Sequence, residues 1–354
     1  MERHLYREKR NGGGVAIDMR KLDIFTHIWP KAFHELLLKQ TGQMKDMHRR
    51  SEAVPMMTNL DRRFAVMDMF DEYQQILSLA SPPPDVVGTR EAWRELSRAG
   101  SDGMAELCQK YPDRFPSFIA SVAMRDPEGA VEEATRAIKQ LGACGIQIYS
   151  NVSGKPLDAP EFRPVFKAME KLGKPIWIHP ARTATFPDYQ TEQVSQYEIW
   201  WTFGWPYESS AAQARIVFSK MLDEMPELKF IIHHAGGMVP FFEGRVGAGW
   251  DQLGARTSSV DYKPLLKELK KRPLDYFKMF YADTATFGSK SALVCALDFY
   301  GIEHVLFASD APFDPEGGPM YIRETIKVID SLDISKESRE RLYYKNACKL
   351  LGIK

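Results

Sequence analysis

Eight short apolar runs recur along this chain, and four of them end at a histidine or an aspartate. The residues at which these four runs end are, in chain order, His27, His179, the pair His233 and His234, and Asp310. Strands that alternate with helices favour a parallel sheet. In a closed barrel of eight such units, catalytic residues lie where the strands end. The pattern therefore predicts that histidines and an aspartate converge at one end of a barrel.

The eight apolar runs alternate with amphipathic stretches over most of the chain. The expected strands cover residues 22–26, 75–78, 117–122, 145–149, 175–178, 229–232, 278–282 and 305–309. Helical periodicity is clearest in residues 63–70, 91–110, 127–141, 159–172, 209–223, 288–300, 320–332 and 335–351. No repeat or low-complexity linker interrupts this order, so we expect one domain over residues 21–354.

Composition excludes several classes of partner. Lysine plus arginine and aspartate plus glutamate both number 47, so the formal net charge is zero. A nucleic-acid or anionic-membrane surface needs a basic excess, and no apolar run approaches the length of a membrane span. Residues 1–20 are hydrophilic and lack the apolar core of a signal peptide, so we expect a flexible extension. The cysteines follow no zinc spacing, which predicts free thiols in the cytoplasm: Cys108, Cys144, Cys295 and Cys348.

Residues 181–205 interrupt the alternation and are rich in aromatic side chains, including Trp200, Trp201 and Trp205. A long loop within a compact barrel is usually functional. The segment is predicted to form either the wall of a substrate pocket or a dimer interface, because both gather aromatic residues.

The residues at the strand ends suit metal or acid–base chemistry. Side chains alternate along a strand, so Asp23, Phe25 and His27 share one face, which points inward in a barrel. Of the adjacent pair at 233 and 234, one can face the site; His234, next to two glycines, is predicted to be functional and His233 to point outward. Two histidines and an aspartate suit one divalent ion, Zn²⁺ or Mn²⁺.

Six segments, taken in their order and spacing, resemble the amidohydrolase superfamily. More closely, the chain resembles the 2-amino-3-carboxymuconate-6-semialdehyde decarboxylase group, which includes γ-resorcylate-type aromatic acid decarboxylases. The segments are RFAVMD at 63–68, LGACGIQI at 141–148, IHP at 178–180, WPYES at 205–209, HAGG at 234–237 with Gly244-Arg245, and SDAPF at 309–313.

This resemblance implies a distorted (β/α)8 TIM barrel with one divalent metal at its top, acting on a small carboxylic acid. It assigns His27, His179 and Asp310 to the metal, and His234 with Asp310 to catalysis. Arg63 and Arg245 match residues that hold a substrate carboxylate, Arg245 from the neighbouring subunit of a homodimer. Trp205 is added as a substrate-binding residue of the aromatic segment.

One residue departs from the family pattern. The family begins with His-x-His or Glu-x-His, whereas this chain has Phe25-Thr26-His27. Phenylalanine cannot bind a metal, so three protein ligands remain, which is a workable number for a catalytic site. Asp23 could replace the missing ligand or orient His27.

Three functions remain open on these residues. The first is metal-dependent, non-oxidative decarboxylation of a small unsaturated or aromatic acid, with the arginine forks holding the carboxylate. The second is hydrolysis or hydration on the same scaffold, with His234 as the base. The third is a non-catalytic barrel that lost its metal together with the first ligand.

Overall fold

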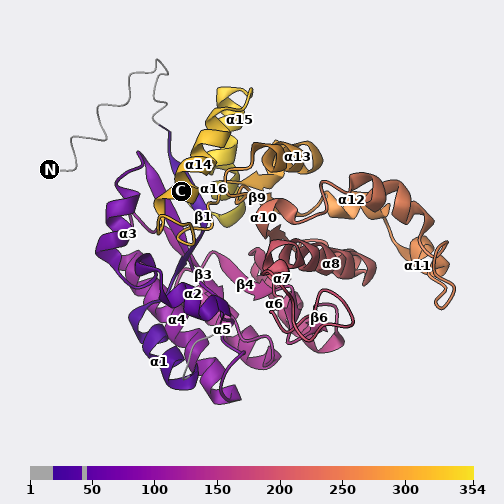
Figure 1. Cartoon of the computed structure of the whole chain (residues 1–354), viewed down its shortest axis with the longest axis horizontal. Coiled ribbons are helices and arrows are strands. Elements are labelled where there is room, and N and C mark those ends of the chain that lie inside the picture. The colour runs from indigo at the N-terminus through magenta and orange to yellow at the C-terminus, as the bar shows by residue number, and fades with distance from the viewer. Residues whose placement is uncertain (1–18, 42–45) are drawn as a thin grey trace.

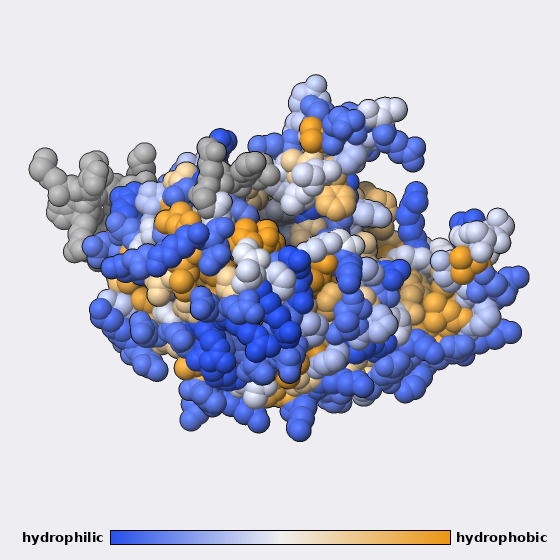
Figure 2. All heavy atoms as spheres, turned by 90° about the horizontal axis from the view of Figure 1, so that it is seen from below, coloured by the Kyte–Doolittle hydropathy of each residue, from blue (hydrophilic) through white to orange (hydrophobic). Residues whose placement is uncertain are grey.

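The computed structural model describes residues 19–41 and 46–354. The greater part of the extension predicted for residues 1–20 therefore lies outside the described residues. Helices surround a central sheet, and α11 and α12 extend away from the barrel on the right of Figure 1. Figure 2 shows hydrophilic residues over most of one face, with hydrophobic residues gathered in separate patches. None of the helices in the described part of the chain has the length and apolar character needed to cross a membrane.

Eight parallel strands form the predicted (β/α)8 barrel. Their order is β1-β2-β3-β4-β7-β8-β9-β10. The strands are β1 (Lys21–Ile28), β2 (Tyr73–Leu79), β3 (Ser117–Ser121), β4 (Gly145–Tyr149), β7 (Ile176–His179), β8 (Phe230–Ile232), β9 (Tyr281–Asp283) and β10 (Val305–Leu306). A small antiparallel hairpin, β5 (Asn151–Val152) with β6 (Lys155–Pro156), follows β4 and was not predicted.

The barrel closes between β1 and the segment that follows β10. The Ile24 amide donates to the Phe307 carbonyl at 2.9 Å, and the His27 amide donates to the Ala311 carbonyl at 2.8 Å. The Asp310 amide in turn donates to the Phe25 carbonyl at 3.2 Å. These bonds bring the end of β1 beside Asp310, although 283 residues separate His27 from Asp310 in the chain.

The helices pack around the strands and end where the sequence provides capping residues. Thr89 accepts a hydrogen bond from the Ala92 amide at the start of α4, and Gly173 ends α6 in a left-handed conformation. The α-helices are α1 (Lys31–Thr41), α2 (Asp46–Glu52), α3 (Leu60–Met67), α4 (Arg90–Lys110), α5 (Pro127–Gln140), α6 (Arg163–Leu172), α7 (Ile199–Thr202), α8 (Gly204–Phe218), α9 (Met221–Glu224), α10 (His233–Gly236), α11 (Lys263–Glu268), α12 (Pro273–Phe277), α13 (Lys290–Tyr300), α14 (Pro319–Asp330), α15 (Lys336–Glu340) and α16 (Asn346–Leu351).

Short helices of other types join these elements. The 3-10 turns are η1 (Pro55–Met57), η2 (Pro160–Phe162), η4 (Trp250–Gln252) and η5 (Ile302–His304), and the π-helical turns are η3 (Arg245–Gly249) and η6 (Arg341–Lys345). The predicted helix over residues 335–351 is thus α15, η6 and α16 in succession. Six of the described α-helices were not predicted: α1, α2, α7, α10, α11 and α12.

An apolar cluster fills the barrel below the strand ends. Side chains from six strands contribute to it, and helix α16 adds Ala347 and Leu351. Strand β1 carries one extra residue here: Ile24 and Phe25 together lie opposite Ile76 of β2. Such a bulge breaks the strict alternation of side chains along a strand. The floor of the site is therefore apolar and closed.

Candidate active site

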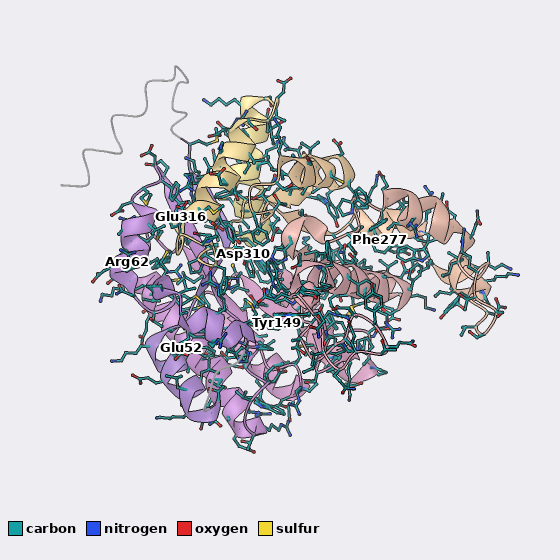
Figure 3. All side chains as sticks on the ribbon, in the orientation of Figure 1. Glu52, Arg62, Tyr149, Phe277, Asp310 and Glu316 are labelled. Carbon is teal, nitrogen blue, oxygen red and sulfur yellow. The ribbon has the colours of Figure 1, made fainter. Side chains whose placement is uncertain are left out.

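A cavity of about 1310 Å³ opens at the end of the barrel where the strands finish. Its wall includes His27, His179, His234 and Asp310, which the sequence predicted to converge. Figure 3 shows Asp310 near the middle of the molecule, far from the labelled surface residue Arg62. Aromatic rings form much of the remaining wall: Trp200, Trp201, Trp205, Phe287, Phe313 and Tyr321.

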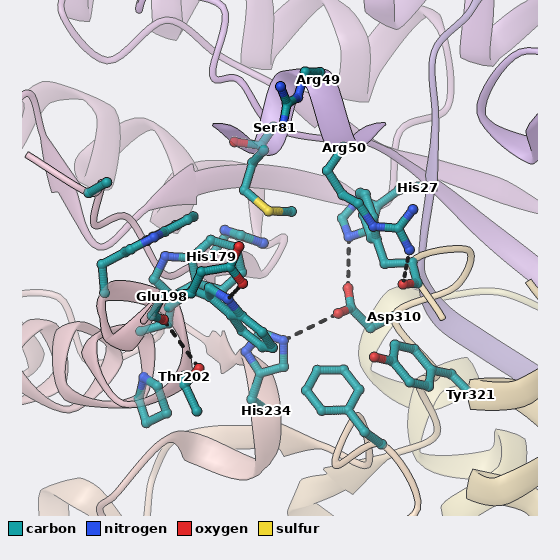
Figure 4. A pocket seen from close by; sticks show the side chains of 18 of the residues that line it. His27, Arg49, Arg50, Ser81, His179, Glu198, Thr202, His234, Asp310 and Tyr321 are labelled. Atoms are coloured by element: carbon teal, nitrogen blue, oxygen red, sulfur yellow. Dashed lines mark hydrogen bonds and ion pairs between the residues drawn. The ribbon is translucent and has the colours of Figure 1, made fainter. Parts of the chain in front are cut away.

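Asp310 links two histidines at the bottom of this cavity. His27 Nε2 lies 2.9 Å from Asp310 Oδ1, and His234 Nε2 lies 3.4 Å from Asp310 Oδ2 (Figure 4). Burial favours the neutral acid, but the hydrogen bonds of His234 and His27 outweigh it and hold the pKa of Asp310 below its ordinary range. Burial likewise opposes a charged His234, yet the bond to Asp310 and its charge raise the pKa of His234. The arrangement thus favours a protonated imidazole at His234 beside an ionised carboxylate at Asp310.

The backbone is strained at the same place. His234 has φ 56° and Asp310 has φ 64°, in the left-handed region that residues with a side chain rarely adopt. Of the nine such non-glycine residues described, five line the cavity: Tyr197, Glu198, His234, Phe287 and Asp310. Each left-handed residue costs about 1–3 kcal/mol and persists where the surroundings impose it, typically at functional sites. Strain thus supports this cavity as the active site.

His179 lines the cavity, and one of its two ring nitrogens is already hydrogen-bonded to the backbone. Its Nδ1 lies 2.7 Å from the Pro180 carbonyl oxygen, so Nδ1 carries the proton and Nε2 has a free lone pair. Burial, followed by the neighbouring imidazoles of which His233 is the first, places the pKa of His179 well below its ordinary value. The side chain is therefore neutral at physiological pH.

The structure corrects the predicted direction of His233. Its ring stacks on Phe25 across the barrel, with centroids 3.4 Å apart and planes 22° apart. Because β1 and β8 are not neighbours in the sheet, this contact passes through the barrel interior. The side chain points inward, where its Nδ1 lies 2.7 Å from Asp283 Oδ2. The left-handed turn at His234 lets both adjacent histidines face the interior.

The predicted metal ligands share the cavity but do not form a ready metal site. Within residues 19–41 and 46–354, no group of three His, Cys, Asp or Glu side chains has the spacing to hold a metal ion. The rings of His27 and His179 are 6.1 Å apart, and Phe25 lies against both His27 and His233. Asp23, the suggested replacement, bonds instead to Tyr73 and Ser309, and burial raises its pKa to about 7. These side chains do not fit the family's metal centre.

Arg63 does not reach the cavity, contrary to its predicted role. It is fully buried, and its Nη1 donates to Gln75 Oε1 at 2.7 Å. Its Nη2 donates to the backbone carbonyls of His27 and Met56. Burial lowers the pKa of Arg63 to about 10, which leaves it charged at neutral pH. Arg63 therefore holds the end of β1, and with it His27, rather than a substrate.

Two arginines that the sequence did not single out take its place at the cavity. Among the described lining residues, Arg49 and Arg50 of α2 are the two with a permanent positive charge. Arg50 Nη2 donates to the carbonyls of Phe313 at 2.8 Å and Asp314 at 3.4 Å, which directs it toward Asp310 (Figure 4). The adjacent Arg49-Arg50 pair was visible in the sequence, but no motif marked it.

Trp205 of the aromatic segment lines the described cavity, whereas Arg245 does not. Arg245 is exposed on η3, over the ring of Phe242, and does not line the described part of its own cavity. Trp205 does line it: the indole lies 5.3 Å from the His179 ring, edge to face, and its Nε1 donates to the Arg182 carbonyl. The segment 181–205 thus forms part of the pocket wall, which was one of its two predicted roles.

Two curated relatives align with most of the chain. It is 29% identical over 350 residues to 2-amino-3-carboxymuconate-6-semialdehyde decarboxylase of Dictyostelium discoideum, covering 94% of this chain and 92% of the relative. It is also 29% identical over 306 residues to γ-resorcylate decarboxylase of Rhodococcus jostii, covering 83% and 87%. Both relatives belong to the group that the motifs resembled.

Solved structures confirm the barrel. A 5-carboxyvanillate decarboxylase from Novosphingobium aromaticivorans, complexed with manganese and 4-hydroxy-3-methoxy-5-nitrobenzoic acid, superposes with a TM-score of 0.78 at 23% identity, covering 95% of this chain and 96% of that one. A 2,6-dihydroxybenzoate decarboxylase from Rhizobium gives a TM-score of 0.74 at 24% identity, covering 94% and 99%. At these identities the likeness shows the fold.

The family of this chain is shown by how much of the chain one family model matches. The amidohydrolase family model matches residues 23–353. This range contains most of β1, all the other strands of the barrel, and Asp310 after β10. The barrel, the strand-end residues and this match agree. The chain therefore belongs to the amidohydrolase family, as the resemblance of its motifs predicted.

Proposed function

We propose that this protein is a carboxy-lyase that removes CO₂ from a small aromatic or unsaturated carboxylic acid. The observation that carries the proposal is Asp310 held between His27 and His234 at the bottom of a cavity with aromatic walls and two arginines. Aromatic walls suit a planar apolar ring, and arginine suits a carboxylate. The two curated relatives, both decarboxylases, support the same reaction class.

The His234–Asp310 pair supplies the proton that decarboxylation consumes. The substrate carbon that carries the carboxylate takes one proton from this pair. The bond from that carbon to the carboxyl carbon then breaks, its electron pair stays with the substrate, and CO₂ leaves. Solvent returns one proton to the pair, so atoms and charge balance. A positioned acid of this kind contributes about 10²–10⁴-fold to a rate.

The carboxylate would lie at Arg50 and Arg49 rather than at Arg63. Arg50→Ala should raise the Michaelis constant about 10- to 100-fold, because a hydrogen bond to a charged group contributes about 1.5–3 kcal/mol. Arg50→Lys keeps the charge but loses the planar fork, so its Michaelis constant should be intermediate. Steady-state kinetics of the two variants measure this, with the exposed Arg98→Ala of α4 as the control. An unchanged Michaelis constant in Arg50→Ala would exclude Arg50 as the carboxylate site.

The proposal includes a homodimer in which Arg245 completes the partner's cavity. Arg245 of the Gly244-Arg245 motif is exposed, and Phe241, four residues earlier, is 79% exposed, so both are accessible to a second copy. Mixing inactive Arg245→Ala and Asp310→Asn subunits should then restore activity at about one quarter of the sites, because mixed dimers carry one intact site each. Native mass spectrometry, which resolves the mixed dimer from the two homodimers, confirms that the subunits mix. Mixed dimers with no activity would rule out a shared site.

The reaction itself is tested with a panel of hydroxybenzoates and unsaturated acids. CO₂ release, with one solvent hydrogen on the product carbon, is the expected result. Incorporation of ¹⁸O from labelled water without CO₂ release would show the hydrolase or hydratase chemistry instead. Wild-type protein that does neither on any acid would leave the proposed decarboxylase without support.

A further inference from the structure

The feature that separates this barrel from a metal centre is the pair formed by Phe25 and His233. Phe25 is fully buried, and its ring lies among three imidazoles. The ring centroids are 4.4 Å from His27, 3.4 Å from His233 and 6.0 Å from His179. An apolar ring therefore occupies the position of the family's first metal ligand, where it packs against His27 and stacks on His233.

His233 is held in this position from the opposite side. Asp283 accepts from His233 Nδ1 at 2.7 Å, and the same carboxylate accepts from the amides of Ala235 and Ala285, each at 3.1 Å. The fully buried ring of His233 therefore faces the Phe25 ring. Its Nε2 has no hydrogen-bond partner among the described residues. Asp283 thus fixes His233 as the second half of a packed pair.

The other predicted metal-binding side chains already form hydrogen bonds within the protein. Asp310 uses one carboxylate oxygen for His27 and the other for His234. His27 Nδ1 lies 3.2 Å from Ser78 Oγ and 3.3 Å from the Leu79 carbonyl oxygen. His179 Nε2 is the one nitrogen of the predicted ligand set that stays free, and a single imidazole holds a divalent ion weakly.

We propose that the Phe25–His233 pair replaces a metal ligand in this barrel, so that the protein keeps the family fold without a tightly bound divalent metal. The inference rests on the proposed function in one respect: if the protein is a decarboxylase, its turnover does not require added metal. The packing of the pair stands independently of the reaction. Metal binding and turnover are therefore measured separately.

The first measurement is the metal content of wild-type protein prepared without a polyhistidine tag. Mass spectrometry of the purified protein should find far less than one Mn, Zn, Fe or Co per chain. Titration with MnCl₂ or ZnCl₂ should show no site tighter than that of the Phe241→His control, which adds an exposed imidazole. One metal per chain in the wild type, removed by a chelator together with activity, would overturn the proposal.

The second measurement restores the missing ligand. Phe25→His should bind Mn²⁺ or Zn²⁺ about 10–100-fold more tightly than the wild type, the range seen when the shell around a metal is changed. Phe25→His combined with His233→Ala should bind at least as tightly, because the stacked partner is gone. Equal affinity in Phe25→His and the wild type would show that position 25 does not exclude the metal, which overturns the proposal. Metal bound by the wild type and lost in His233→Ala would do the same.

Activity distinguishes the failure of this inference from the failure of the proposed function. CO₂ release by chelated wild-type protein, unchanged by MnCl₂, supports both. CO₂ release that appears with MnCl₂ keeps the decarboxylase and overturns metal independence. No CO₂ release under either condition contradicts the proposed function, while the titrations still decide the metal question. Should Phe25→His fail to fold, the wild-type content and titration remain decisive.

Discussion

Asp310→Asn is expected to lower the turnover number about 10²–10⁴-fold, the contribution of a positioned acid or base. The asparagine keeps the size of the side chain but lacks the negative charge that lies 2.9 Å from His27 Nε2 and 3.4 Å from His234 Nε2, and that raises the pKa of His234. It also leaves one histidine facing an amide nitrogen, which donates rather than accepts. The measurement is CO₂ release under saturating substrate.

A matched carboxylate provides the control for this variant. Glu316, labelled with Asp310 in Figure 3, lies close to Asp310 in the chain. It is exposed and paired with Arg323 at 2.8 Å. Glu316→Gln should leave turnover near the wild-type value, because exposed ion pairs contribute about 0–1 kcal/mol. If Asp310→Asn kept wild-type turnover while circular dichroism showed an intact fold, the proton-transfer role of Asp310 would be excluded.

Arg63→Met is expected to lower the free energy of unfolding by about 2–5 kcal/mol, the range for breaking a buried, charged hydrogen-bond network. The arginine is fully buried and donates to the carbonyls of His27 and Met56, which methionine would leave unpaired. Urea unfolding measures the loss. Because Arg63 does not line the cavity, the Michaelis constant of the folded variant should stay close to that of the wild type.

Arg62 provides the control that distinguishes the loss of a buried side chain from the loss of one positive charge. Arg62 is the preceding residue of the same helix and is exposed at the edge of the molecule (Figure 3). Arg62→Met should change stability by about 0.5 kcal/mol or less, as surface substitutions do. A stable Arg63→Met protein with a strongly raised Michaelis constant would instead return Arg63 to the substrate site that its motif suggested.

The strand ends were predictable because hydrophobic runs and their boundaries are local properties. His27, His179 and Asp310 follow such runs directly, and all three line the cavity. The predicted bounds were less accurate for the last two strands. Lys278 is the C-terminal cap of helix α12, so β9 begins at Tyr281 rather than at residue 278. Strand β10 stops at Leu306, after which the chain turns into the left-handed conformation of Asp310.

Side-chain direction was the part that local patterns could not supply. Alternation placed His233 outside, yet the left-handed turn at His234 lets it stack on Phe25 inside the barrel. The motif placed Arg63 at the substrate, yet α3 packs it beneath β1. In both cases the outcome depends on elements distant in the chain.

The alternation of apolar runs with amphipathic helices was enough to predict the barrel, since such elements bury their hydrophobic faces in this arrangement. It also determined which residues end the strands, and so which histidines and aspartate could meet. The hydrogen-bond partners of these residues, in contrast, depend on contacts between segments that are distant in the chain. A single extra residue in β1 and a left-handed backbone at His234 and Asp310 set which atoms come within hydrogen-bond distance. Packing across the barrel imposes these backbone conformations, and no local run of residues encodes that packing.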